Sequence, residues 1–128
     1  MTYLLDTDIL INIKKGNTTL KDSIRKLIEL SQDNPSITLL TFSEYYYGSL
    51  KPGKQADAIE FLNRFNHVTI SKASAKRFAE LNYKYKNLGQ PFGTVDLFNA
   101  AIAIEENMIV ISRDKSFEKL SELKKVLI

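Results

Sequence analysis

The sequence contains no cysteine and no tryptophan, and His67 is its only histidine. The lack of cysteine excludes disulfide bonds, cysteine nucleophiles and thiolate metal sites, and it is usual in a cytoplasmic protein. A single histidine also excludes a histidine-rich zinc site. Any metal would therefore be held by oxygen ligands, which favours Mg²⁺ or Mn²⁺.

Long apolar runs are absent as well. No stretch reaches the roughly 18 apolar residues that indicate a membrane-spanning helix, so we expect no membrane association. The first residues carry no basic segment or cleavage motif, and Asp6 would interrupt the core of a signal peptide. These features predict a cytoplasmic location.

The composition is that of a folded domain. A length of 128 residues suits one domain spanning residues 1–128. Hydrophobic residues make up 44% of the chain, enough for a core, and 26% charged residues argue against disorder. The net charge of +3 permits an anionic partner such as RNA without requiring one.

Short apolar runs alternate with segments of helical periodicity. The spacing predicts helices in the segments between the runs, including a long one through residues 78–88 and a nearly all-apolar one over residues 95–106. This alternation predicts an α/β fold, a three-layer α/β/α sandwich around a mostly parallel sheet of four or five strands. The predicted strands are residues 3–5, 36–41, 67–70 and 108–111, with an edge strand at 126–128.

Four acidic residues stand where strands pass into helices. Asp6 follows the first strand, Glu44 the second and Asp114 the fourth, and Asp96 begins the helix over residues 95–106. The carboxyl ends of parallel strands share one edge of the sheet, where ligands bind in such folds. The four carboxylates can therefore meet in one crevice.

Each acid also has a purely structural interpretation. The candidates are helix caps at Asp6, Asp8 and Asp114, the last through Phe117, a capping box between Thr41 and Glu44, and a helix-dipole interaction at Asp96. At Asp96 this interpretation is weakest, because a carboxylate in a buried helix is costly without a partner.

Considered together, the four acids favour a metal site. Carboxylates a few ångströms apart repel one another, and divalent cations are what normally hold them together. Without histidine or cysteine, the set Asp6, Glu44, Asp96 and Asp114 predicts an Mg²⁺ or Mn²⁺ site. Its natural substrate is a phosphodiester, which one metal-activated water would attack while a second cation could stabilise the leaving oxygen.

Four segments resemble motifs of the PIN-domain ribonucleases of the VapC toxin type. Residues 4–11 resemble the opening strand and first acid, and residues 41–48 resemble the Thr-x-x-Glu-Leu-x-x-Gly motif. Residues 96–103 resemble Asp-x-x-Ile-Ala-Ala, and residues 111–117 resemble Thr-Arg-Asp-x-x-Phe. The segments occur in the family's order across nearly the whole chain.

The resemblance implies a PIN-like fold and a metal-dependent endoribonuclease acting on RNA. It implies that Asp6, Glu44, Asp96 and Asp114 bind the metal, with Thr7 and Ser112 as hydrogen-bond donors nearby. It further implies the toxin of a toxin–antitoxin pair, a homodimer inhibited by a cognate antitoxin whose tail enters the acidic crevice.

Several neighbouring residues are auxiliary candidates. Asp8 follows the first acid closely. Asn99 stands where the family usually has an apolar residue, and it either hydrogen-bonds the site or merely tolerates a polar neighbour. Arg113 either pairs with Asp114 or, together with Lys115, contacts the RNA backbone.

A groove for the antitoxin is expected near the second acid. Tyr45, Tyr46 and Tyr47 are candidates for it together with Leu10 and Ile13, since aromatic residues are enriched at interfaces. Consecutive helix residues cannot share one face, so part of this set belongs to the core.

Two other functions compete with the nuclease. Asp6 and Asp8 match the Asp-x-Asp of haloacid-dehalogenase-type phosphatases, but Leu10 replaces the expected Thr or Val and Glu44 would have no role. Only this reading predicts an acid-stable aspartyl phosphate. The other is an inactive RNA- or protein-binding module, which predicts no Mn²⁺-induced rise in melting temperature.

Overall fold

The computed structural model describes residues 2–128, and its strands form one five-stranded sheet. The strand order is β3-β2-β1-β4-β5, and every neighbouring pair is parallel. The prediction of a mostly parallel sheet of four or five strands is confirmed, with five strands and no antiparallel pair in this part of the chain. The strands are β1 (Tyr3–Leu5), β2 (Ser36–Thr38), β3 (Asn66–Val68), β4 (Ile109–Ser112) and β5 (Lys125–Leu127).

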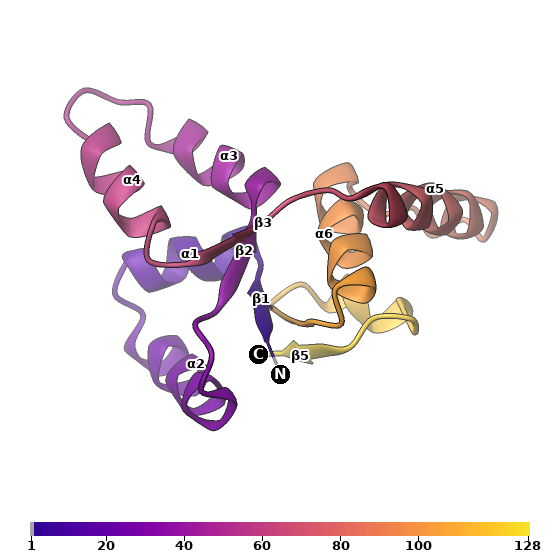
Figure 1. Cartoon of the computed structure of the whole chain (residues 1–128), viewed down its shortest axis with the longest axis horizontal. Helices are drawn as coiled ribbons and strands as arrows, with labels where there is room; N and C mark the ends of the chain where they lie inside the picture. The colour runs from indigo at the N-terminus through magenta and orange to yellow at the C-terminus, as the bar shows by residue number, and fades with distance from the viewer. Residues whose placement is uncertain (1) are drawn as a thin grey trace.

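Helices cover both faces of the sheet. In Figure 1, α1, α2 and α4 lie on one side of the central strands, and α5 and α6 lie on the other. This arrangement confirms the predicted three-layer sandwich. The helices are α1 (Thr7–Lys14), α2 (Thr18–Ser31), α3 (Leu39–Gly48), α4 (Gln55–Leu62), α5 (Lys72–Asn87) and α6 (Thr94–Glu105), followed by the 3₁₀ turn η1 (Lys115–Lys119).

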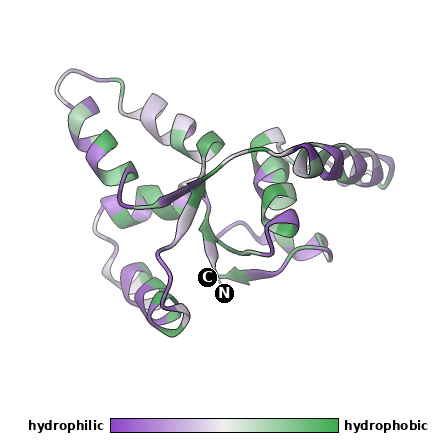
Figure 2. Ribbon diagram, viewed as in Figure 1, coloured by the Kyte–Doolittle hydropathy of each residue, from purple (hydrophilic) through white to green (hydrophobic). Residues whose placement is uncertain are grey.

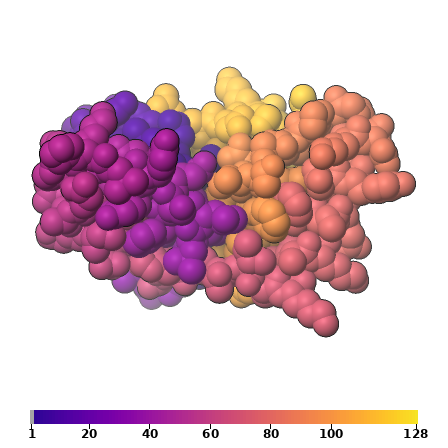
Figure 3. Space-filling model, turned by 90° about the horizontal axis from the view of Figure 1, so that it is seen from above, coloured from indigo at the N-terminus to yellow at the C-terminus, as the bar shows by residue number. Residues whose placement is uncertain are grey.

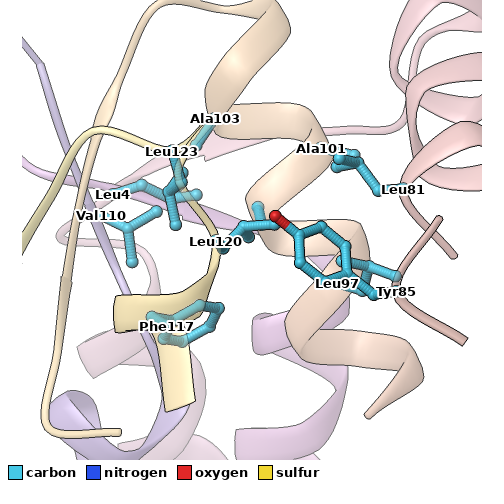
Figure 4. Packing of buried hydrophobic residues seen from close by; sticks show 11 residues of the cluster. Leu4, Leu81, Tyr85, Leu97, Ala101, Ala103, Val110, Phe117, Leu120 and Leu123 are labelled. Carbon is cyan, nitrogen blue, oxygen red and sulfur yellow. The ribbon is translucent and has the colours of Figure 1, made fainter. Parts of the chain in front are cut away.

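The central strand β1 supplies side chains to two separate cores. Leu4 lies beside Val110 of β4 in the core under α5 and α6, which Figure 4 shows closed by Leu120 and Leu123. Leu5 belongs to the opposite core, under α1, α2 and α4. A strand buried on both faces needs an uninterrupted apolar run, and this is why the first strand is readable in the sequence.

Helices α5 and α6 pack together but differ in character. Figure 2 shows α5 as mainly hydrophilic, whereas α6 is much more hydrophobic. The buried residues of α6 run almost without interruption from Leu97 to Ala103, while α5 buries Leu81 and Tyr85 against it. The predicted all-apolar helix is therefore the inner of the two.

The second strand is shorter than predicted, and the proposed capping box is wrong. Strand β2 ends at Thr38, and α3 begins at once with Leu39. The Thr38 hydroxyl caps the helix by accepting a hydrogen bond from the Thr41 backbone N–H (3.1 Å). Thr41 is thus already inside the helix. A short, mainly apolar segment such as residues 37–40 does not distinguish strand from helix by periodicity alone, and here the cap at Thr38 marks the boundary.

The long helix predicted over residues 78–88 is α5, which begins six residues earlier, at Lys72, whereas the other elements shift little. Strand β3 begins one residue earlier than expected and ends at Val68, and the last short helix is the 3₁₀ turn η1. Within residues 2–128, no helix combines the length and the apolar character needed to cross a membrane.

Candidate active site

The strand order creates a switch point beside β1. The chain passes from β1 outward to β2 and β3, and then returns to the other side of β1 as β4 and β5. Ligands of open parallel sheets bind at the carboxyl ends of the strands where the order reverses, here those of β1 and β4. In Figure 3, seen from the side towards which α3 extends, the first half of the chain meets the second across this face.

Asp6 follows β1 and has two hydrogen-bond donors. Its side chain caps α1 by accepting from the Thr7 backbone N–H (2.8 Å), and its other oxygen accepts from Ser112 Oγ (2.8 Å). Burial raises the pKa of Asp6, the two hydrogen bonds oppose this, and repulsion from Asp114 and Glu44 adds to the rise. The structural role as a cap and a place among the acids therefore coexist at Asp6.

Ser112 joins the ends of β1 and β4. It is fully buried, donates to Asp6, and accepts from the backbone N–H of Asp114 (2.9 Å). The exposed Asp114 carboxylate accepts from the Ser116 backbone N–H (2.9 Å), so it caps η1 through Ser116 and not through Phe117 as predicted. One hydroxyl thus links the first acid to the loop that carries the last.

Asp96 lies in the first turn of α6, where the structure gives it acids as neighbours. Burial raises its pKa to about 6, with further contributions from the negative charges of Asp6, Asp114 and Glu44. The fold therefore brings all four predicted acids into one electrostatic cluster. These repulsions are the clearest sign that the sequence-predicted set converges.

Glu44 extends from α3 and is exposed. Its carboxylate accepts a short hydrogen bond from Thr7 Oγ1 (2.6 Å). The predicted auxiliary Asn99 is 4% exposed and bonds to Thr38 and Thr41, not directly to an acid. Thr38 was not predicted as a partner of Asn99, because the pattern of residues 36–41 places Thr38 in the interior of a longer strand.

Asp8 and Arg113 are not brought into the cluster. Asp8 is exposed on α1, where the Asn12 amide donates to it (3.2 Å), and it does not contribute to the pKa shifts of Asp6 or Asp96. Arg113 is also exposed, and the ion pairs recorded in residues 2–128 do not include one with Asp114.

The donor set suits a hard divalent cation, although the carboxylates are not drawn together around one point. Among residues 2–128, no three acidic or histidine side chains form a ready-made metal cage. All the charged donors are nevertheless oxygens, and Asp96 has a raised pKa that a nearby cation would reverse. The chemistry of the four acids therefore fits Mg²⁺ or Mn²⁺.

A groove adjoins Glu44 between α1, α3 and α4. It has a volume of about 530 Å³. Of the predicted groove residues, Tyr45 lines it, but Leu10 is fully buried in the core, so its assignment to the groove was wrong. The sequence did not predict the lysines of the groove, because they come from separate segments of the chain and come together only in the fold. The groove is lined by Ile11, Tyr45, Gly48, Ser49 and Ala58, the lysines Lys14, Lys15, Lys51 and Lys54, and the acids Glu44 and Asp57.

Comparisons with known proteins agree along the whole length. The PIN domain model matches residues 3–123. A curated relative, "Ribonuclease VapC2" of Haemophilus influenzae, is 28% identical, over 97% of this chain and 96% of that protein.

Solved structures show the same fold. VapBC2 of Rickettsia felis, crystallised with a promoter DNA fragment, contains a chain with 23% identity and a TM-score of 0.85, covering 100% of this chain and 99% of that one. A toxin–antitoxin complex from Klebsiella pneumoniae gives 25% identity and a TM-score of 0.78, covering 98% and 99%.

Proposed function

The chain belongs to the PIN-domain family, and from this premise we propose that it is the ribonuclease toxin of a VapBC-type toxin–antitoxin pair. The observation that carries the proposal is the cluster of Asp6, Glu44, Asp96 and Asp114 at the carboxyl edge of the sheet. The family match leaves no support for a haloacid-dehalogenase-type phosphatase, and the second acid that reading needs, Asp8, stays outside the cluster.

The reaction is the metal-dependent hydrolysis of RNA phosphodiester bonds within the strand. Asp6, Glu44, Asp96 and Asp114 would hold Mg²⁺ or Mn²⁺, and the cation would supply Lewis-acid chemistry there: a lowered pKa for water and compensation of negative charge. Ser112 and Thr7 orient their acids by hydrogen bonds. The negative charges of Asp6, Asp114 and Glu44 raise the pKa of Asp96, so a cation held there would relieve that repulsion.

RNA binding is supported by the basic residues near the acids. Lys51 and Lys54 line the groove beside Glu44, and Arg113 and Lys115 are exposed next to Asp114. Contacts of this kind reach phosphate oxygens, so binding should weaken steeply with salt. They position the strand without specifying its sequence.

The groove also suits an antitoxin. Relatives have been crystallised as toxin–antitoxin complexes. Ile11, Tyr45 and Ala58 provide an apolar floor, and the lysines at its rim would pair with an acidic segment of the antitoxin. The free toxin would be a cytoplasmic homodimer of a single domain spanning residues 1–128.

The test is cleavage of total cellular RNA by antitoxin-free protein. Wild type with Mn²⁺ should give discrete products that disappear with EDTA and with Asp96→Asn. Glu122→Gln is a matched control, since it neutralises an acid that is paired away from the cluster. At a temperature at which this less stable variant is fully folded, its cleavage should equal that of wild type.

Two results would count against the proposal. Cleavage that survives Asp96→Asn would come from another nuclease. A wild type that neither binds Mn²⁺ nor cleaves RNA would favour an inactive binding module, and a melting temperature unchanged by Mn²⁺ would agree with that outcome.

A further inference from the structure

We propose that Asn99 is a positioning residue for Glu44, acting through two threonine hydroxyls. The first hydroxyl is that of Thr41 on α3, and the second is that of Thr7 on α1. The inference rests on the proposed function, in which Glu44 is one of the metal-binding acids. It adds a buried amide on α6, one turn beyond Asp96, to the residues that shape the site.

Both ends of the Asn99 amide are used. Thr38 Oγ1 donates to Asn99 Oδ1 (2.6 Å), and Asn99 Nδ2 donates to Thr41 Oγ1 (3.0 Å). All three side chains are buried, with Thr38 and Thr41 at 0% exposure and Asn99 at 4%. Water is therefore a poor substitute for any of these bonds, and the amide is held at a defined place between α6 and α3.

The cap at the start of α3 determines which way the amide points. Thr38 Oγ1 accepts from the Thr41 backbone N–H, so its own proton is free to be donated to Asn99. Only the amide oxygen can accept that proton, which leaves the NH₂ group facing Thr41. The amide end towards the site is thus a donor.

The hydrogen bonds that follow run in the same donor-to-acceptor direction, from Asn99 through the hydroxyls of Thr41 and Thr7 to Glu44. The Thr7 hydroxyl lies 2.6 Å from Glu44 Oε1 and 3.3 Å from Thr41 Oγ1. A hydroxyl has one proton, and the short contact to the carboxylate takes that of Thr7. Thr41 accepts from Asn99 and can give its own proton to Thr7, so every donor in the line points towards Glu44.

The side-chain conformation of Glu44 depends on this series of hydrogen bonds, because few other contacts restrain it. The bond from Thr7 is the one hydrogen bond to its carboxylate recorded in residues 2–128, and the side chain is exposed. A free glutamate on a surface samples many rotamers. If Asn99 presented an acceptor or no polar group, the Thr7 proton could turn towards Thr41 and release Glu44.

The test is Mn²⁺ titration calorimetry of RNA-free protein, together with thermal unfolding without metal. Asn99→Leu keeps the branched shape of the side chain, at a somewhat larger volume, and removes both amide contacts. Residues that orient metal ligands typically change affinity by about 10–100-fold, and at this distance we expect about tenfold weaker Mn²⁺ binding. Ser74→Ala is the matched control, because it removes a buried hydroxyl that accepts from the Ser71 backbone N–H and donates to the Ser71 carbonyl, at the start of α5. It should change melting temperature only.

A double-variant cycle separates positioning from stability. In a Thr7→Val background the line to Glu44 is already cut, so adding Asn99→Leu should change Mn²⁺ affinity by less than about twofold. An equal tenfold loss in both backgrounds, or a lowered melting temperature with unchanged affinity, would overturn the proposal while leaving the nuclease intact. A wild type that binds no Mn²⁺ would overturn the proposed function and this inference with it.

A second pair of variants covers the case in which Asn99→Leu does not fold. Thr41→Val removes the intermediate hydroxyl with little change of shape, and Thr41→Ser retains it. Mn²⁺ binding should weaken about tenfold in the first and return to within about twofold of wild type in the second. Equal Mn²⁺ affinities in the two variants would contradict positioning of Glu44 through the Thr41 hydroxyl.

Discussion

Two carboxylates, Glu122 and Asp96, show how differently one fold treats its acids. Burial by itself would raise the pKa of Glu122, but hydrogen bonds from Tyr85 Oη (2.7 Å) and Lys84 Nζ (3.0 Å) outweigh it and lower the pKa to about 2. At Asp96, burial and then the charges of three other acids raise the pKa to about 6.

The difference separates an acid whose charge stabilises the fold from one whose charge destabilises it. Glu122 ties α5 to the segment after η1, and its charge stabilises the fold. The charge of Asp96 opposes folding, and no hydrogen bond to its carboxylate is recorded in residues 2–128. A nearby cation would offset this cost, which agrees with the proposed metal-binding role of Asp96.

The largest effect on stability is expected from Glu122→Gln, which removes the stabilising charge of this comparison. Its pKa of about 2 against an ordinary 4.5 corresponds to roughly 3 kcal/mol, which partial exposure reduces to about 2 kcal/mol. Urea denaturation near neutral pH should therefore show a loss of about 2 kcal/mol in the free energy of unfolding. An unchanged midpoint would mean that the bonds to Tyr85 and Lys84 contribute nothing net.

The second variant is Asp96→Asn, which in the absence of metal should change the free energy of unfolding in the opposite direction. Removing the charge relieves burial and repulsion, so the free energy of unfolding should rise by about 1–2 kcal/mol while RNA cleavage is lost. Adding Mn²⁺ should stabilise wild type and not the variant. A variant less stable than metal-free wild type would refute this account of the cluster.

The third prediction concerns how the contributions of Asp96 and Glu122 to the free energy of unfolding depend on pH. The folded pKa of Asp96 lies above its ordinary 3.8, so its protonated form favours folding below about pH 4, and that contribution disappears as pH rises through about 6. Glu122 acts in reverse, since its contribution is present above about 4.5 and is lost as pH falls towards 2. The stability gained by Asp96→Asn should shrink by about 1 kcal/mol between pH 7 and pH 4, measured by urea denaturation at each pH.

The smallest effect is expected at Asp8, an acid close to the cluster in sequence but exposed and bonded to Asn12. Asp8→Asn should change the free energy of unfolding by no more than about 0.5 kcal/mol, the size of a helix-dipole contribution, and single-turnover cleavage by less than about twofold. A large loss of cleavage would mean that Asp8 takes part in RNA cleavage, in contradiction to this prediction.

Much of this arrangement was predictable because it follows from local patterns. The apolar run before Asp6 requires a strand buried on both faces, and the parallel sheet then puts the acids after β1 and β4 at the same edge. The start of α3 was not predictable, since Ile37, Leu39 and Leu40 suit a strand or a helix and only the cap at Thr38 separates the two elements.

The sequence by itself determined the layered α/β architecture and the four acids, because alternating periodicity and the positions of strand ends are local properties of the chain. Only the tertiary structure decided which polar groups meet. Thr7, Thr41 and Asn99 lie on three different helices, and the lysines of the groove come from separate segments. Hydrogen bonds reach about 3 Å, so partners far apart in sequence are set by helix packing, which no local pattern encodes.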